Sequence, residues 1–278
     1  MNGTLAVTRY TLVELSRRRV LLVFFILGFL GIAGVAVGLK ILAYFFNQAE
    51  PSGPSFPVEL EFAVIISGVL ADFGLLVAYG IGMTAIYHDL ESGAAVSIFA
   101  KPVSRLAFAT GKVLAGIIGL VAIVGLLAVE TRLVILLFGG GYADVITEQV
   151  LAVVANTLIV MLIVLALTTW MNNIVAAVVA FVYYNVLTGV VQQLHNFVAN
   201  NLIQNDVARA VINVVYWLFP HPLTSNIPEA LVRGQAGGRS TSTTITITAS
   251  GPGDVAWWAF LVLVFSALLY YSVRRRQV

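Results

Sequence analysis

A series of long apolar runs constrains the fold of this sequence more than any other feature. We predict six membrane spans, at residues 20–46, 62–87, 107–138, 149–170, 174–193 and 255–273. Each run is close to or longer than the about 20 apolar residues that a helix needs to cross a bilayer core. Only 10% of the residues are charged, against roughly 25% in soluble domains. The sequence therefore predicts an all-α integral membrane protein, with residues 1–278 forming a single transmembrane domain.

The amino-terminal segment, residues 1–19, differs in character from the first apolar run. A cluster of arginines at 17–19 precedes run 20–46, which is far longer than the roughly 7 to 15 apolar residues of a signal peptide. We therefore expect a retained span. Before it, Leu5, Leu12 and Leu15 fall roughly on one side of a helix, which predicts an interfacial helix on the membrane surface. A frayed tail is the alternative.

Basic residues are distributed unevenly between the predicted loops. With the amino terminus inside, the cytoplasmic side holds about twice as many Lys and Arg residues as the outer side, in agreement with the positive-inside rule. The inner group is Arg9, Arg17, Arg18, Arg19, Lys101, Arg105, Lys112, Arg274, Arg275 and Arg276, and the outer group is Lys40, Arg132, Arg209, Arg233 and Arg239. We expect a multi-pass protein of the cell (plasma) membrane with both termini cytoplasmic.

Residues 194–254 form the longest segment without a predicted span. Its apolar piece, Val207 to Phe219, is followed by two prolines. Thirteen helical residues cover about 20 Å, which is too short for a core of about 30 Å. We expect an external loop with short interfacial or re-entrant helices. Thr and Ile alternate between Thr241 and Thr248, which is compatible with a small β-hairpin or with a disordered loop.

The loop between the second and third spans, residues 88–105, has a distinctive order. Asp89 and Glu91 precede a short apolar stretch, and Pro102 follows it. This order predicts a short helix, parallel to the membrane and exposed to the cytoplasm, that can pass a push from a soluble partner to the two spans it joins.

The next helix begins just after this loop. Ser104 can cap it, while Arg105 and Lys112 are expected to face the lipid phosphates.

At this loop the chain resembles the permease subunits of ABC-2 type ATP-binding cassette transporters. The resemblance rests on three pieces in the family's spacing: Asp89-x-Glu91-x-Gly93, Lys101-Pro102-Val103-Ser104-Arg105, and Gly111-Lys112. The amino-terminal surface helix, the six-span hydropathy and the long loop before the last span agree with it. The outer loop departs from the shortest family members by a Gly-rich segment and a Thr/Ile segment, so no substrate is carried over.

The resemblance implies a type V exporter-like fold, with an interfacial helix, a cytoplasmic coupling helix and short extracellular re-entrant helices. It implies a permease that couples ATP hydrolysis by two separate ABC ATPase subunits, which hold ATP and Mg, to substrate movement. The second permease would be another copy or a homologue. The implied ATPase-coupling residues are Asp89, Glu91, Gly93, Lys101, Pro102 and Arg105.

The chain itself is not expected to be an enzyme or to bind a cofactor. Its nearest match to a phosphate-binding loop, Thr110 to Val113, lacks the first glycine of that motif and the Ser or Thr after the lysine. There is no cysteine, and His88, His195 and His221 have no metal-ligand spacing. No catalytic triad stands out, and nothing suggests nucleic acid.

Polar residues inside the spans are the candidates for a substrate path. Asp72 lies within the second span, where a carboxylate is costly unless it meets water or a partner such as Lys40. The fifth span has an unusual density of polar side chains, which favours a position on the path or the dimer axis; hydrogen bonding between helices is the alternative. The candidate path residues are Asp72, Tyr183, Tyr184, Asn185 and Thr188.

These observations favour an ATP-driven exporter permease and leave one main rival. The same spans could transmit ATPase strokes to an external partner through residues 194–254 without passing a solute. A carrier driven by an ion gradient would need internal repeats or ion ligands in broken spans, and neither is clear.

Overall fold

The computed structural model describes residues 3–17, 19–49, 58–91, 103–139, 145–224 and 250–275. Within these ranges the chain forms helices and no strand. Six candidate spans among the described residues are long and apolar enough to cross a membrane, which confirms the six-helix prediction. They cover Leu21–Leu42, Ile65–Asp89, Arg105–Leu137, Gln149–Thr168, Asn173–Ala199 and Pro252–Arg275.

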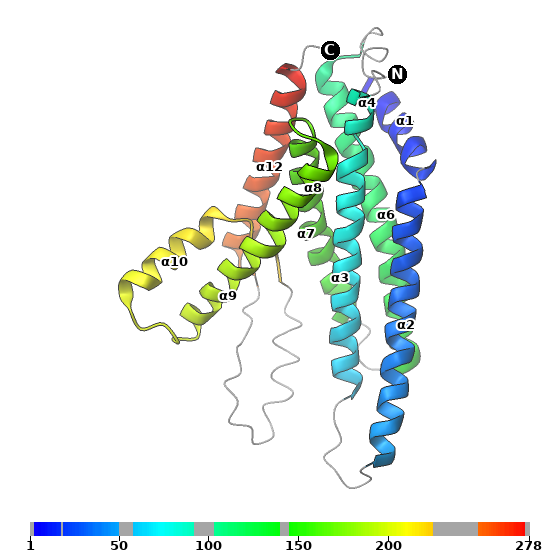
Figure 1. The fold of residues 1–278 in the computed structure, drawn as a ribbon, viewed down its shortest axis with the longest axis vertical. Coiled ribbons are helices and arrows are strands. Elements are labelled where there is room, and N and C mark those ends of the chain that lie inside the picture. The colour runs from blue at the N-terminus through cyan, green and yellow to red at the C-terminus, as the bar shows by residue number, and fades with distance from the viewer. Residues whose placement is uncertain are drawn as a thin grey trace.

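The helices follow one another along the chain as a bundle (Figure 1). The first elements are α1 (Gly3–Arg17), α2 (Arg19–Ala49), α3 (Val58–Thr84), the short α4 (Tyr87–Glu91), α6 (Arg105–Gly139) and α7 (Val145–Thr168). The fifth span consists of α8 (Asn173–Phe181), the π-helix η1 (Val182–Leu187) and α9 (Thr188–Ala199). The last helices are α10 (Asp206–Leu218) and α12 (Pro252–Arg275).

Helix α3 lies at the centre of the bundle and packs against α2, α6, α7 and α8. Small residues allow this close packing: a Cβ atom on Gly82 would lie only 2.6 Å from the Cβ atom of Val164 on α7. Fully buried Ile81 and Met161 belong to the same core. Many apolar side chains on the outside of the bundle, such as Leu30, stay exposed, as expected for a surface in contact with lipid.

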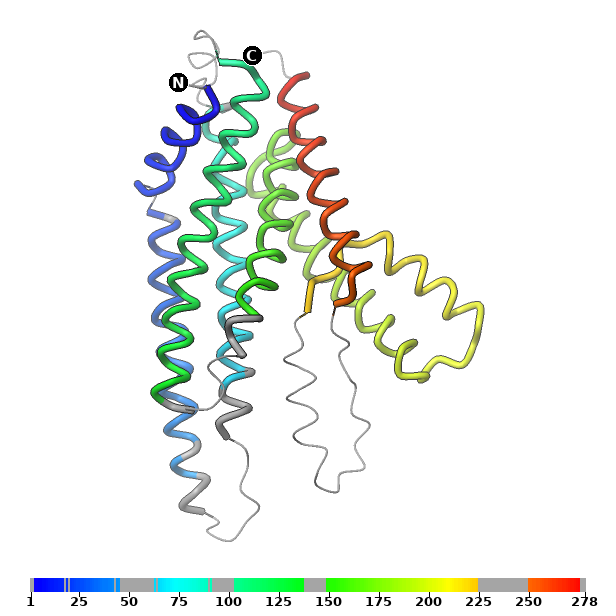
Figure 2. The backbone as a smooth tube through the Cα atoms, turned by 180° about the vertical axis from the view of Figure 1, so that it is seen from behind, coloured from blue at the N-terminus to red at the C-terminus, as the bar shows by residue number. Residues whose placement is uncertain are grey.

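The two ends of the bundle differ. Helices α1 and α4 and the last turn of α12 lie together at one end, here called the terminal end (Figures 1 and 2). At this end the Arg105 guanidinium joins α6 to α12 by donating a hydrogen bond to the carbonyl oxygen of Arg274, at 2.5 Å. The other end is called the distal end. On that side α9 and α10 form a hairpin that projects from the bundle, and α10 has no buried residue.

Helix α1 packs against α6 with one face. The buried residues are Val7, Thr8, Thr11 and Leu15, whereas Leu5 is 62% exposed. A position of this helix on the membrane surface stays a prediction.

Several sequence predictions fall outside the described residues. They are the possible β-hairpin at 241–248, the loop-helix segment 94–100, and the coupling residues Gly93, Lys101 and Pro102. The short helix expected near 207–219 is present as α10.

Candidate functional site

A buried group of charged residues joins three elements at the terminal end. Lys112 on α6 is fully buried, and its Nζ atom lies 2.5 Å from Oδ2 of Asp89 and 3.4 Å from Oε2 of Glu14. Asp89 belongs to α4 and Glu14 to α1. The rings of Tyr10 and Phe108 lie 5.6 and 5.8 Å from the same ammonium, within the range of cation–π attraction. We call Glu14, Asp89 and Lys112 the charge cluster.

The neighbouring glycine explains how α1 reaches this lysine. A Cβ atom on Gly111 would lie 2.8 Å from the Cβ atom of Val7 and 3.0 Å from the carbonyl oxygen of Thr4. The Thr8 hydroxyl also donates a hydrogen bond to the carbonyl oxygen of Gly111, at 3.2 Å. In the pair Gly111-Lys112, the glycine thus admits α1 and the lysine binds its carboxylate.

The position of Lys112 corrects the sequence analysis. The expectation that this ammonium faces lipid phosphates is wrong, because α1 and α4 cover it and their carboxylates neutralise it. Asp89, which was expected to be available to a soluble partner, is 1% exposed. Its contact with Lys112 is an ion pair without hydrogen-bond geometry, so both buried carboxylate oxygens lack a hydrogen bond within the described residues.

The other described loop residues lie nearer the surface. Glu91 is exposed at the end of α4, and Arg105 is partly exposed. Ser104 caps α6 as predicted, since its hydroxyl accepts a hydrogen bond from the Ala107 amide at 3.1 Å. Glu91 is therefore the described acidic residue of the loop motif that a soluble partner can reach.

A second candidate site is a pocket of about 240 Å³ on the distal side of the bundle. It lies between α3, α7 and the fifth span. Its lining residues are Ala71, Leu75, Val153, Asn156, Thr157, Tyr184, Asn185, Thr188, Gly189, Gln192 and Pro222.

The structure brings three of the five predicted path residues into this pocket. Tyr184, Asn185 and Thr188 line it, all from the fifth span. Tyr183 instead packs its ring against that of Phe219, with centroids 5.6 Å apart. Asp72 is not among the lining residues and is exposed on the surface of α3. Three of the candidate path residues thus share one pocket lining, Asp72 and Tyr183 do not, and the substrate path itself stays a prediction.

The fifth span changes its winding beside the pocket. The π-helix η1 covers Val182–Leu187, and the Thr188 hydroxyl donates a hydrogen bond to the carbonyl oxygen of Tyr183, five residues earlier, at 3.1 Å. Short π-helical turns inside α-helices are rare and frequently occur at functional sites. The irregular winding coincides here with the polar face that lines the pocket.

Sequence analysis missed the contribution of α7 to the pocket. Asn156 and Thr157 are adjacent polar residues within the apolar run 149–170. Such a polar pair inside an apolar run could have indicated their role from the sequence. The Asn156 side-chain nitrogen donates to the carbonyl oxygen of Leu223 at 2.9 Å, and its side-chain oxygen accepts from the Leu223 amide at 2.8 Å. Asn156 thus pairs with a backbone segment as a neighbouring strand would.

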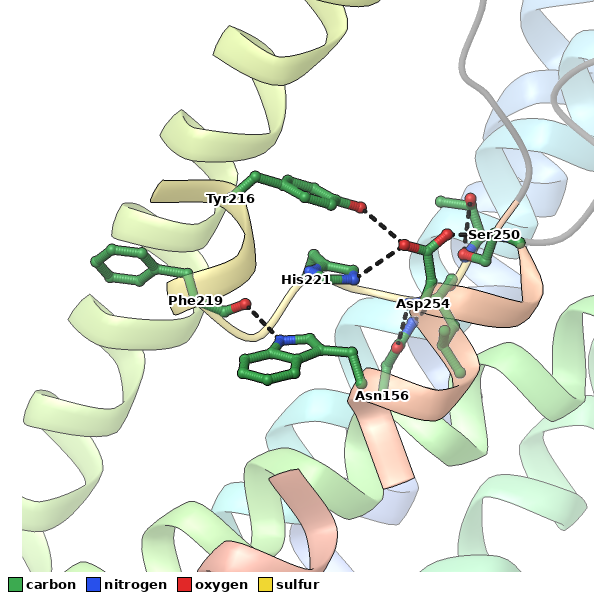
Figure 3. Close-up of polar contacts among 10 residues, drawn as sticks. Asn156, Tyr216, Phe219, His221, Ser250 and Asp254 are labelled. Atoms are coloured by element: carbon green, nitrogen blue, oxygen red, sulfur yellow. Dashed lines mark hydrogen bonds and ion pairs between the residues drawn. The ribbon is translucent and has the colours of Figure 1, made fainter. Parts of the chain in front are cut away.

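That segment, residues 219–224, is called the strap, and it adjoins the pocket through Pro222. Its first residue is fixed by the Trp257 indole, which donates to the carbonyl oxygen of Phe219 at 3.2 Å. The amide of its last residue, Thr224, donates a hydrogen bond to the Ser250 hydroxyl oxygen at 2.8 Å. Together with Asn156, these contacts attach the strap to α7 and to the segment that enters α12 (Figure 3).

An aromatic stack continues the attachment of the strap. The Tyr216 ring lies between the rings of His195 and His221, with centroid distances of 4.0 and 4.1 Å. Oδ1 of Asp254 lies 3.1 Å from His221 Nε2 and accepts a hydrogen bond from the Tyr216 hydroxyl at 3.4 Å (Figure 3). Burial lowers the pKa of His221, and the nearby Asp254 carboxylate opposes this change.

The two stacked histidines, distant in sequence, thus pack against the same tyrosine ring. They occupy opposite faces of one tyrosine ring, so their nitrogens do not converge on one point. No group of three or more potential His, Cys, Asp or Glu metal ligands occurs among the described residues. His88 lies at the terminal end, beside a surface hollow that Glu14 also lines.

No protein-family model matches the sequence, and no curated protein matches it. Function is therefore inferred from the loop motif and from the geometry of the charge cluster and the pocket.

Proposed function

We propose that the chain is the membrane-spanning permease subunit of an ATP-driven transporter of the ABC-2 type, acting as an exporter. In this proposal the terminal end lies in the cytoplasm, and two separate ATPase subunits with ATP and Mg dock beneath loop 88–105. A second permease, identical or homologous, completes the membrane part. The ATPases supply the hydrolysis, and this chain converts their movement into a change at the pocket.

The charge cluster is the observation that carries the proposal. Loop 88–105 leaves the bundle at α4 and returns at α6, and Asp89 and Lys112 join these two elements through a buried ion pair. Glu14 adds α1 to the same group. Because separating buried charges is costly, a force applied to the loop would move α1, α4 and α6 together rather than deform the loop alone.

Helix α3 provides a direct mechanical connection between the two candidate sites. One end of α3 leads into α4, while Ala71 and Leu75 of the same helix line the pocket. A rigid helix packed against α2, α6 and α7 can transmit a displacement over this distance. In this proposal, a push on the loop would reach the pocket wall through α4, the two-residue turn at Ala85 and Ile86, and α3.

One observation favours the rival function, mechanical transmission to an external partner. The α9–α10 hairpin projects from the bundle, and α10 exposes apolar side chains such as Val207, Val214 and Leu218. An external protein or the second permease could cover them. Transport by vesicles that contain only this permease and its ATPase would support the exporter, and a lack of transport despite normal ATP hydrolysis would support the rival.

Docking at the loop can be tested at the exposed Glu91, together with Gly93 of the same motif. Charge reversal by Glu91→Lys, combined with Gly93→Trp, should reduce co-purification of the natural ATPase subunits and transporter-stimulated ATP hydrolysis. Each exposed ion pair contributes only about 0.2–1 kcal/mol, so the bulky residue is included to add a steric block. Asp206→Lys is the matched control, because Asp206 is an exposed acidic residue at the distal side. Equal ATPase binding by both variants would contradict docking at this loop.

A further inference from the structure

The pocket contains hydrogen-bonding groups that the described residues do not satisfy. Tyr184 is only 5% exposed, and its hydroxyl has no hydrogen-bond partner among the described residues. The side-chain amides of Asn185 and Gln192 also make no hydrogen bond within the part of the chain that the structure describes. A buried hydroxyl without a partner has lost the hydrogen bonds that it would make in water, and a ligand that offers a partner restores one. These three groups share one wall of the pocket.

The lining from the other helices leaves few free polar groups, and the lining carries no charge. Ala71 and Leu75 of α3 and Val153 of α7 are apolar. The polar side chains of α7, Asn156 and Thr157, are already hydrogen-bonded within the protein. No Asp, Glu, Lys, Arg or His occurs among the lining residues. An ionic ligand would have to enter without a counter-charge, at a high desolvation cost. The lining therefore selects a neutral ligand that offers hydrogen bonds on one side and an apolar surface on the other.

The size of the pocket limits the ligand further. A volume of about 240 Å³ lies below the roughly 300–1,000 Å³ typical of sites that enclose a drug-sized molecule. One small ring or a short polar headgroup fits, while the rest of a larger molecule must remain outside. All but one of the lining residues lie within candidate membrane spans, so the surroundings of the pocket are suited to an alkyl chain.

We propose that this pocket binds the uncharged, hydroxyl- or amide-bearing headgroup of an amphiphile whose alkyl part lies in the bilayer. Tyr184, Asn185 and Gln192 form the hydrogen-bonding wall, and Leu75 and Val153 contact the apolar edge of the headgroup. That this amphiphile is the exported substrate rests on the proposed transporter function. Binding itself does not.

Photolabelling in lipid nanodiscs tests the proposal with defined probes. The probe is an alkyl glucoside with a photoreactive diazirine in its chain, next to the sugar. Two matched probes carry the same chain with a sulfate or a trimethylammonium headgroup. Labelling of the peptide that contains residues 184–192 is measured by mass spectrometry. We expect saturable labelling by the glucoside and only unsaturable background labelling by the two charged probes.

Variants assign the labelling to the pocket. One lost hydrogen bond of about 0.5–1.5 kcal/mol corresponds to a roughly two- to tenfold loss of affinity. We expect this loss for Tyr184→Phe, which removes only the hydroxyl, and for Gln192→Leu. Val190→Leu is the matched control, because Val190 is exposed on the same helix and does not line the pocket. Thermal unfolding of each variant verifies that it is folded.

Three results would overturn the proposal. Equal saturable labelling by all three headgroups would mean that only the alkyl chain binds. Unchanged labelling in folded Tyr184→Phe and Gln192→Leu would place the binding elsewhere. Competition by free glucose as strong as by unlabelled alkyl glucoside would identify a soluble sugar rather than an amphiphile. The labelling experiment contains no ATPase. A negative labelling result therefore does not contradict ATPase docking at the loop, and a negative docking result does not contradict probe binding in the pocket.

Discussion

The terminal end and the distal side of the molecule differ in the kind of polar groups that they bury. At the terminal end, Lys112 and Asp89 form a buried ion pair, and the partly buried Glu14 adds a second carboxylate from a third element. At the distal pocket, the polar groups are neutral and several have no partner among the described residues. A buried ion pair resists separation because each charge would be left without its partner, whereas neutral polar groups without a hydrogen bond can bind a ligand. The comparison indicates a terminal end that moves as a unit and a distal side that can adapt to what it binds.

The strongest test of this contrast removes the central charge of the terminal end. Lys112→Met leaves Asp89 and Glu14 without their cation, and removal of one partner of a buried ion pair costs about 3–5 kcal/mol. We expect a large fall in the thermal unfolding midpoint in nanodiscs. The double variant Lys112→Met/Asp89→Asn should recover part of the loss.

Arg19→Met is the matched control for this variant. Arg19 is exposed at the start of α2, and we expect a change within about 0.5 kcal/mol. If Lys112→Met were as mild as this control, the terminal end would not be held by its charges, and the contrast with the distal side would be lost.

The next test concerns the approach of α1 to α6. Gly111→Ala places a methyl group within 3 Å of the Val7 side chain, and overpacking of this kind costs about 1–3 kcal/mol. Amide hydrogen exchange in α1 should become faster. Gly125→Ala in the same helix meets open space and should be neutral or slightly stabilising. Slow exchange in α1 of Gly111→Ala would show that the contact is looser than the structure indicates.

A smaller effect is expected where Asn156 holds the strap. Asn156→Ala removes two hydrogen bonds to Leu223, and their partly buried position suggests a loss of about 1–2 kcal/mol. Exchange of the Leu223 amide should accelerate roughly 5- to 30-fold while the terminal end is unaffected. Asn213→Ala, at an exposed position of α10, is the control. Acceleration at both ends would mean that the two regions are not independent.

The smallest effect should come from titration of His221. Burial lowers its pKa below the ordinary 6.5, so a released strap binds a proton that the attached strap resists. The contribution to stability is then complete above pH 6.5 and is lost as the pH falls toward the lowered pKa. The effect is small because the attraction of Asp254 opposes desolvation; Tyr216 also faces the imidazole.

Thermal unfolding between pH 7.5 and pH 5 checks this expectation. His221→Gln should remove part of the acid-induced loss of stability that the unchanged protein shows. Identical pH profiles for the two proteins would mean that His221 does not titrate with strap release.

The contrast between the ends also separates what could be predicted from the sequence from what could not. The six spans were predictable because the length and apolarity of a run directly determine whether a helix can cross a bilayer. The inward orientation of Lys112 was not, because charge counting treats every basic residue near a span end alike. Its burial depends on Gly111, and the role of that glycine emerges only when α1 is in place.

Part of the pocket was predictable and part was not. The polar density of the fifth span pointed to Tyr184, Asn185 and Thr188, since polar side chains in a membrane helix need a reason to be there. The same argument favoured Asp72, but this residue lies on the exposed face of α3. The pairing of Asn156 with a segment 67 residues away is a long-range contact that local patterns do not encode.

The π-helix in the fifth span also has an evolutionary consequence. Each α-helical residue turns the chain by about 100°, and a π-turn holds one residue more than an α-turn. A residue inserted into a helix that stays α-helical rotates everything after it by about 100°, whereas a π-turn takes up the extra residue and leaves the following helix close to its original register. Loss of one residue from Val182–Leu187 with a return to α-helical winding would therefore leave the α9–α10 hairpin facing nearly the same way. The middle of this span can thus gain or lose one codon without reorienting the external hairpin.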